Sequence, residues 1–69
     1  MNEFETSILK SFKNNNQINF PMNDFLLKKK YSDAIDNLSN DGYINIKARS
    51  IGYVIANITD YGISYLNNI

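Results

Sequence analysis

The chain has 69 residues, which predicts a single domain over residues 1–69 with a small hydrophobic core. It contains neither cysteine nor histidine, so disulfides and thiolate metal sites are excluded, and the commonest general base and metal ligand are missing. Seven Lys and Arg residues balance seven Asp and Glu residues, and this zero net charge argues against a dedicated binder of duplex nucleic acid.

The first third of the chain predicts a helix followed by a short strand. Residues 3–13 carry apolar side chains at helical spacing, and three asparagines at 14–16 end the helix. Residues 17–20 alternate polar and apolar side chains, which predicts a brief strand that Pro21 stops. Since no apolar run predicts a signal peptide or a membrane span, we expect a cytoplasmic location.

The middle of the chain predicts two short helices joined by a turn. The first is expected over residues 22–30, with Asn23 or Asp24 near its start, Phe25 and Leu26 as its apolar residues, and three lysines at its end.

The turn between these helices is expected at Tyr31. Ser32 is a suitable N-cap for the second helix, which we expect over residues 33–40 with Ile35 and Leu38 facing inward. Gly42 is the expected C-terminal stop of that helix.

The last third predicts a β-hairpin and a final helix. Residues 43–47 and 53–58 alternate as strands do, with residues 48–51 at the tip and Gly52 in the bend. Thr59 is the expected N-cap of a helix over residues 60–67. Gly62 weakens this helix unless a neighbour packs closely against it.

Two segments resemble the bacterial winged helix-turn-helix superfamily. They are Ile35-x-x-Leu38-x-x-x-Gly42-Tyr43-Ile44, at the junction of recognition helix and wing, and Ile58-Thr59-Asp60-x-Gly62-x-x-Tyr65-Leu66, after the wing. With the order of elements, the resemblance covers nearly the whole chain. It implies an α+β fold with a three-helix core, a β-hairpin wing and a C-terminal helix. Members of this superfamily serve as repressors, as DNA binders in replication, or as protein-docking modules.

The expected recognition helix is poorly suited to reading DNA. Its exposed positions include Asp33 and Asp36, which would approach a dense row of phosphates. On the same face, Asn37 is able to pair with an adenine edge, and an aspartate is able to accept from a cytosine amino group. The simpler interpretation is that Asp33 begins the helix and Asp36 is a solvated charge.

Basic residues flank this helix on both sides. We expect phosphate contacts from the run before it and from the wing, where an arginine can enter a minor groove. With Asn37, the candidate nucleic-acid residues are Lys28, Lys29, Lys30, Asn37, Lys47 and Arg49. The competing interpretation is that the lysines complement a helix C-terminus and that Arg49 is an exposed loop charge. Contacts from the flanks alone predict weak, salt-sensitive binding to duplex or single-stranded DNA.

A candidate protein interface lies on the hairpin. If the strands alternate regularly, Tyr43, Tyr53 and Ile55 share the face opposite the buried one, and exposed aromatic residues of this kind commonly mark a partner surface. The competing interpretation is that another element covers part of this face.

The residues do not suggest an enzyme, a cofactor or a metal site. There is no glycine-rich phosphate loop and no serine beside a base. The leading hypothesis is a non-enzymatic accessory or adaptor subunit. It would dock on a larger replication or transcription protein and assist nucleic-acid binding, as a small phage or mobile-element protein could. The alternative is a stand-alone dimeric regulator of duplex DNA, although the chain offers no residues for the long dimerisation helix of many such repressors.

Overall fold

A computed structural model describes residues 1–23 and 25–69, without the side chains of Phe25 and Leu26. The expectations for Asp24 at a helix start, and for Phe25 and Leu26 as apolar side chains, lie outside the described residues.

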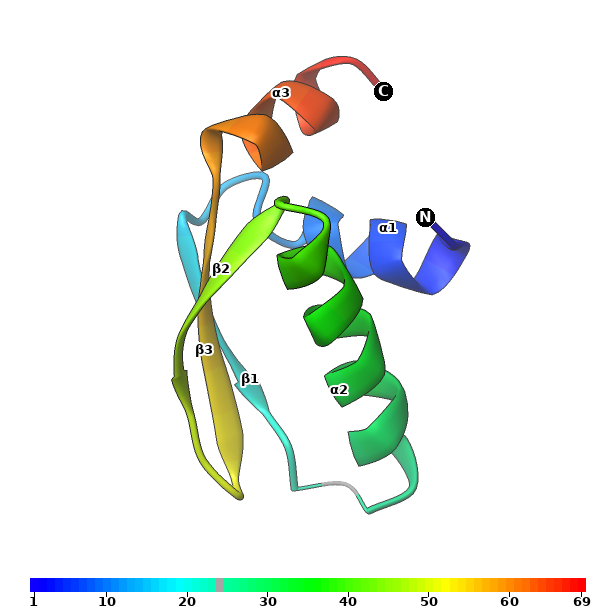
Figure 1. Cartoon of the computed structure of the whole chain (residues 1–69), viewed down its shortest axis with the longest axis vertical. Helices are drawn as coiled ribbons and strands as arrows, with labels where there is room; N and C mark the ends of the chain where they lie inside the picture. Colours follow the sequence, from blue (N-terminus) through cyan, green and yellow to red (C-terminus); the bar gives the residue numbers. More distant parts are fainter. Residues whose placement is uncertain (24) are drawn as a thin grey trace.

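Within the described residues the chain forms a small α+β domain with three helices and a three-stranded antiparallel sheet (Figure 1). The elements are α1 (Glu3–Lys10), β1 (Gln17–Pro21), α2 (Phe25–Asn40), β2 (Ile44–Arg49), β3 (Tyr53–Ile58) and α3 (Asp60–Asn67). The strands lie in the order β1-β3-β2.

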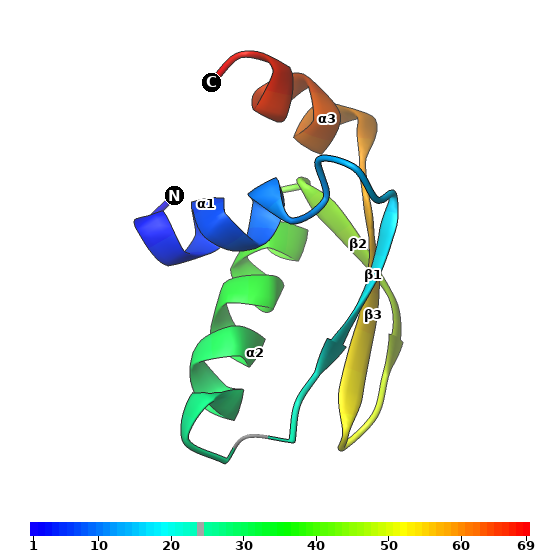
Figure 2. The same ribbon diagram turned by 180° about the vertical axis from the view of Figure 1, so that it is seen from behind.

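The helices gather on one side of the sheet. Figures 1 and 2 show α1 and α2 against one face and α3 across one end, while no described helix covers the other face. The core between them is apolar, and its largest fully buried side chains are Leu9, Ile35, Leu38 and Ile44. Burial of such side chains is the main favourable term in folding a chain of this size.

The expected turn at Tyr31 is wrong, because α2 is one continuous helix of 16 residues. Ser32 resembles an N-cap, but no proline or glycine interrupts residues 25–40. Tyr31, Ile35 and Leu38 follow one another at spacings of four and three residues, so a single apolar stripe runs through the expected break. Burying this stripe outweighs the local preference of one serine. The helix-turn-helix and its separate recognition helix are therefore absent from the described chain.

The remaining elements agree closely with expectation. The strand over 53–58 and the last helix are confirmed, and the strand expected over 17–20 forms but includes Pro21. The strand expected over 43–47 runs from Ile44 to Arg49, and the first helix ends at Lys10 rather than at residue 13. Gly42 follows α2 with a φ of +87°, a conformation that favours glycine. Thr59 is the N-cap of α3, and its hydroxyl accepts a hydrogen bond from the backbone N–H of Gly62.

A β-bulge reverses the side-chain pattern near the end of β2. The register between β2 and β3 shifts between Ile46 and Ala48, so that Arg49 lies opposite the buried Val54. Regular alternation would have placed Arg49 on the same face as Asn45, away from the helices. Because directly opposed residues share a face, the bulge turns Arg49 toward α2 instead.

Candidate functional site

The lysine run (Lys28, Lys29 and Lys30) lies in the N-terminal half of α2, on the fourth to sixth residues of the helix. The interpretation that these lysines complement a helix C-terminus is therefore wrong. They lie near the positive end of the helix dipole instead, and the first turn of α2 contains no acidic residue. This arrangement is mildly unfavourable for the helix, and it concentrates positive potential at one end of the molecule.

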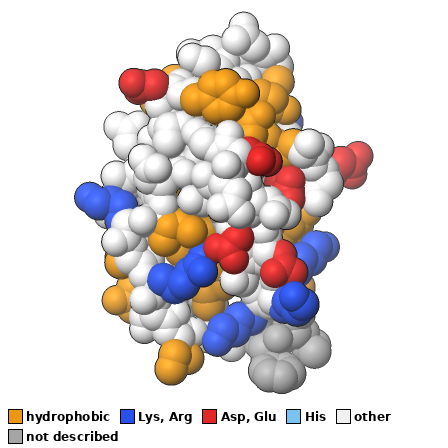
Figure 3. All heavy atoms as spheres, in the orientation of Figure 1, with side chains coloured by type: hydrophobic (Ala, Val, Ile, Leu, Met, Phe, Trp, Pro, Cys, Tyr) orange, Lys and Arg blue, Asp and Glu red, His pale blue; other side chains and the backbone are white. Residues whose placement is uncertain are grey.

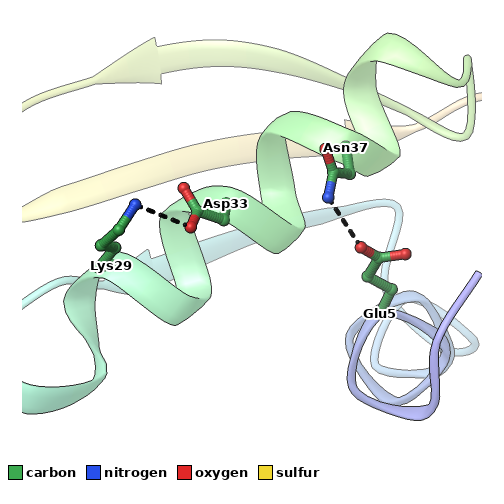
Figure 4. A network of polar contacts seen from close by, with 4 residues as sticks. All are labelled: Glu5, Lys29, Asp33 and Asn37. Carbon is green, nitrogen blue, oxygen red and sulfur yellow. Dashed lines mark hydrogen bonds and ion pairs between the residues drawn. The ribbon is translucent and has the colours of Figure 1, made fainter.

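Two residues of the lysine run have partners. The Nζ atom of Lys29 lies 3.1 Å from the Oδ2 atom of Asp33, one turn further along α2 (Figure 4). The Nζ atom of Lys30 lies 4.4 Å from the ring centroid of Phe4, a cation–π contact with α1. The side chains of Lys29 and Asp33 are 87% and 59% exposed, so their ion pair is weak and open to exchange with another anion.

The side chain of Asn37 connects α2 to α1 through a hydrogen bond and is therefore not available to contact a base. Its Nδ2 atom donates a hydrogen bond of 3.0 Å to the Oε2 atom of Glu5 (Figure 4). Glu5 is only 7% exposed, and it also forms a capping box with Asn2 at the start of α1. A buried carboxylate needs such donors, which gives Asn37 a structural role.

Arg49 lies in an ion pair with Asp36 of α2. The bulge in β2 makes this contact geometrically accessible, since it turns Arg49 toward the helix. Both side chains are nearly half exposed, so solvent screens the pair. In this conformation Arg49 bridges β2 and α2 and does not project from the hairpin tip.

Lys28 and Lys47 are the remaining candidate cations, and both are exposed. Figure 3 shows basic and acidic side chains intermingled over α2 and the neighbouring hairpin, not a uniform basic surface. Of the five candidate cations, Lys29 and Arg49 are therefore compensated by carboxylates within the domain.

The structure separates the three candidate interface residues. Tyr53 and Ile55 lie on the sheet face without a helix, where they oppose Pro21 and Asn19 of β1. Tyr43 precedes the first residue of β2 and packs against α3 instead. The three residues therefore do not form the expected common patch but lie on two separate surfaces, because β2 begins only after Tyr43.

Tyr43, Tyr61 and Tyr65 form a tyrosine cluster at the end of the molecule that α3 occupies. The rings of Tyr43 and Tyr61 stack with centroids 4.9 Å apart and an interplanar angle of 24°. Tyr65 meets Tyr43 edge-on at 5.2 Å. Tyr61 was missed as an interface candidate, although its spacing of four residues from Tyr65 already places both on one helix face.

Contacts between α3 and the turn before β2 fix the position of the tyrosine cluster. The hydroxyl of Thr59 lies 2.6 Å from the carbonyl oxygen of Gly42 and 3.0 Å from that of Tyr43, and it donates to these acceptors. A Cβ atom on Gly62 would lie 2.3 Å from the carbonyl oxygen of Tyr43, so only glycine permits this approach. A side-chain hydrogen bond with Tyr61, together with burial, raises the pKa of Tyr43 above its usual range.

Acidic residues border the tyrosine cluster. Asp60 precedes Tyr61 in the first turn of α3, and the charge of Asp41 acts on the Tyr43 hydroxyl. Both aspartates are exposed, and neither forms an ion pair with any residue that the structure describes. Figure 3 shows hydrophobic side chains gathered over α3 with acidic ones beside them. This end is thus aromatic and negative, in contrast to the lysine run at the other end of α2.

Comparison with protein-family models, with curated proteins and with solved structures gives no match. Among the described residues, no group of three or more acidic side chains is placed to hold a metal ion. No helix in that part of the chain combines the length and apolar character needed to cross a membrane.

Proposed function

We propose that the chain is a non-enzymatic adaptor that docks on a larger replication or transcription protein and assists nucleic-acid binding. The tyrosine cluster carries the docking half of this proposal. Tyr61 is 60% exposed although it stacks on another ring, and a fixed, exposed aromatic side chain is the usual anchor of a protein interface. Tyr53, 39% exposed, lies apart from the tyrosine cluster, on β3 opposite Pro21.

The order of helix, strand, helix, hairpin and helix is compatible with a winged helix in which the two central helices are fused into α2. Such a fusion removes the recognition helix but keeps the hairpin and the last helix, which would suit a module that docks on protein.

The nucleic-acid half is supported by the lysine run and by Lys47. Lys28 and Lys47 are exposed, and Lys29 is only loosely paired. Contacts of this kind bind phosphates without reading bases, so the expected binding is weak, tolerant of sequence and steeply salt-dependent. The alternative function, a dimeric reader of duplex DNA, has less support, because Asp33 and Asp36 lie on α2 and Asn37 is engaged with Glu5.

The nucleic-acid half is tested by fluorescence anisotropy with single-stranded and duplex oligonucleotides between about 50 and about 200 mM salt. We expect weak binding whose logarithmic salt slope falls by about 0.7 to 0.9 for each phosphate contact removed by Lys28→Ala or Lys47→Ala. Sequence-selective, nanomolar binding to duplex DNA would instead support the alternative function, a stand-alone dimeric regulator. A salt slope that neither Lys28→Ala nor Lys47→Ala changes would contradict the proposed role in nucleic-acid binding.

The docking half is tested by affinity purification of the tagged chain from its native host. We expect a replication or transcription protein to be retained at physiological salt and lost with Tyr61→Ala. Tyr53→Ala is the matched control, since it removes an exposed tyrosine from the other surface. Equal loss with both variants, or with neither, would contradict docking through the tyrosine cluster.

A further inference from the structure

This inference rests on the proposed docking function and names the chemistry of the partner. We propose that the tyrosine cluster binds a cationic side chain of the partner protein, an arginine above all. Tyr43, Tyr61 and Tyr65 supply the aromatic surface, and Asp41 and Asp60 supply the charge.

The ring geometry provides a place for a cation. One face of the Tyr61 ring stacks on Tyr43, and the side chain is 60% exposed, so its other face is open to solvent. A cation over the open face of a tyrosine is attracted by the negative ring face. A guanidinium is planar and weakly hydrated, and it stacks on a ring better than an ammonium does.

The charge distribution selects a cation over an anion or a neutral group. Asp33 and Asp36 already have cationic partners on α2 and β2. Asp41 and Asp60 have none among the described residues; Asp41 lies two residues before Tyr43, and Asp60 lies immediately before Tyr61. Asp41 and Asp60 are therefore two negative charges beside the rings, unpaired within the part of the chain that the structure describes. A partner with a positive side chain is its electrostatic complement.

The cluster is preorganised for binding. Thr59 hydrogen-bonds to the turn before β2, and Gly62 lies against the carbonyl group of Tyr43, so α3 is fixed relative to the stacked rings. Binding to fixed rings avoids most of the entropy cost of ordering side chains. The chain already contains one contact of the same chemistry, between Lys30 and the ring of Phe4.

A second copy of this chain fits the cluster less well than a different protein does. Arg49 is the only arginine of the chain, and it pairs with Asp36 of α2. A second copy would have to break this pair to offer a guanidinium, and a foreign arginine would not.

The test uses the intact, isotope-labelled chain and three short peptides that differ only at their central residue: arginine, its neutral isostere citrulline, or glutamate. Binding is followed by nuclear magnetic resonance titration. We expect saturable shifts at Tyr43, Gly62 and Tyr65 with the arginine peptide. The citrulline peptide should bind about two- to fivefold more weakly, which is the range of an exposed cation–π contact, and the glutamate peptide more weakly still.

Variants locate the site. Tyr61→Ala should abolish the shifts, Tyr61→Phe should keep them, and Asp60→Asn should weaken binding about two- to fivefold. Tyr53→Ala is the control that leaves binding unchanged. Unchanged backbone spectra verify that each variant is folded. If Tyr61→Ala unfolds, Asp60→Asn keeps the test decisive, because undiminished binding in that variant would overturn the proposal.

The possible results separate this proposal from the docking function. Equal binding of arginine and citrulline peptides would overturn the choice of a cation, while a Tyr61-dependent partner in the purification would leave docking intact. Loss of that partner from the purification, with the peptide preference intact, would overturn docking alone. A concentration-dependent dimer that Tyr61→Ala abolishes, seen by sedimentation equilibrium, would assign the cluster to a second copy and overturn the proposal.

Discussion

Gly62→Ala should destabilise the protein, although the same change stabilises an isolated helix. Alanine is favoured over glycine inside a helix by about 1 kcal/mol. Here the new Cβ atom would lie 2.3 Å from the carbonyl oxygen of Tyr43 and 2.8 Å from the Cγ1 atom of Ile58. To reach even 3.0 Å from that oxygen, α3 must retreat by about 0.7 Å, which loosens the Thr59 hydrogen bonds beneath it.

The expected net effect is a loss of about 2 kcal/mol in the free energy of unfolding. Overpacking costs about 1 to 3 kcal/mol, and each weakened hydrogen bond adds about 1 kcal/mol, against a helix-propensity gain of about 1 kcal/mol. For a domain of this size, about 2 kcal/mol lowers Tm by about 10 °C. Urea unfolding followed by circular dichroism measures the change, with the m-value expected to stay constant.

Gly52→Ala is the matched control, because a Cβ atom there meets nothing within 4 Å and its φ is not in the left-handed region. It should change stability by no more than about 1 kcal/mol, in the stabilising direction. If Gly62→Ala proved as stable as the parent or more so, the close approach of α3 to the turn before β2 would be refuted.

Three further predictions concern named polar groups. Thr59→Ala removes the N-cap of α3 and should lower the free energy of unfolding by about 1 to 2 kcal/mol, measured by thermal unfolding. An unchanged Tm would contradict the capping role of Thr59. Asn37→Ala leaves the Oε2 atom of the buried Glu5 carboxylate without its donor, so the free energy of unfolding should fall by about 1 to 3 kcal/mol with no loss of DNA affinity; a binding loss without a stability loss would restore Asn37 as a DNA contact. The raised pKa of Tyr43 means that the folded state holds its proton longer than the unfolded state does, so the stability of the fold should fall as pH rises above about 10. Absorbance titration should show the pKa of Tyr43 lowered in Tyr61→Phe, and an unchanged pKa would exclude the hydrogen bond as its cause.

The hairpin and the last helix could be predicted because their signals are local. The alternation of residues 53–58 and the threonine before α3 each specify one conformation within a few residues. The turn expected at Tyr31 does not form, because the capping signal is the single residue Ser32, whereas the apolar stripe from Tyr31 to Leu38 runs through the expected break. A longer periodic pattern buries more surface and prevails over a single capping residue.

The candidate site was less predictable because its contacts join distant parts of the chain. Glu5 and Asn37 are 32 residues apart, and Arg49 meets Asp36 only through a bulge that strand alternation does not reveal. The stacking of Tyr43 on Tyr61 depends on how closely α3 packs, which Gly62 decides through the absence of a side chain.

The continuity of α2 has a mechanical consequence. At 1.5 Å per residue, the 16 residues of α2 form a helix about 24 Å long. Figure 1 shows this helix running along the long axis of the molecule. Two short helices joined by a turn would bend at the joint, whereas a single helix does not. The lysine run and the turn that carries Tyr43 are therefore kept at a constant separation. A phosphate bound at the lysine run and a partner bound at the tyrosine cluster would therefore be held at a fixed distance from each other.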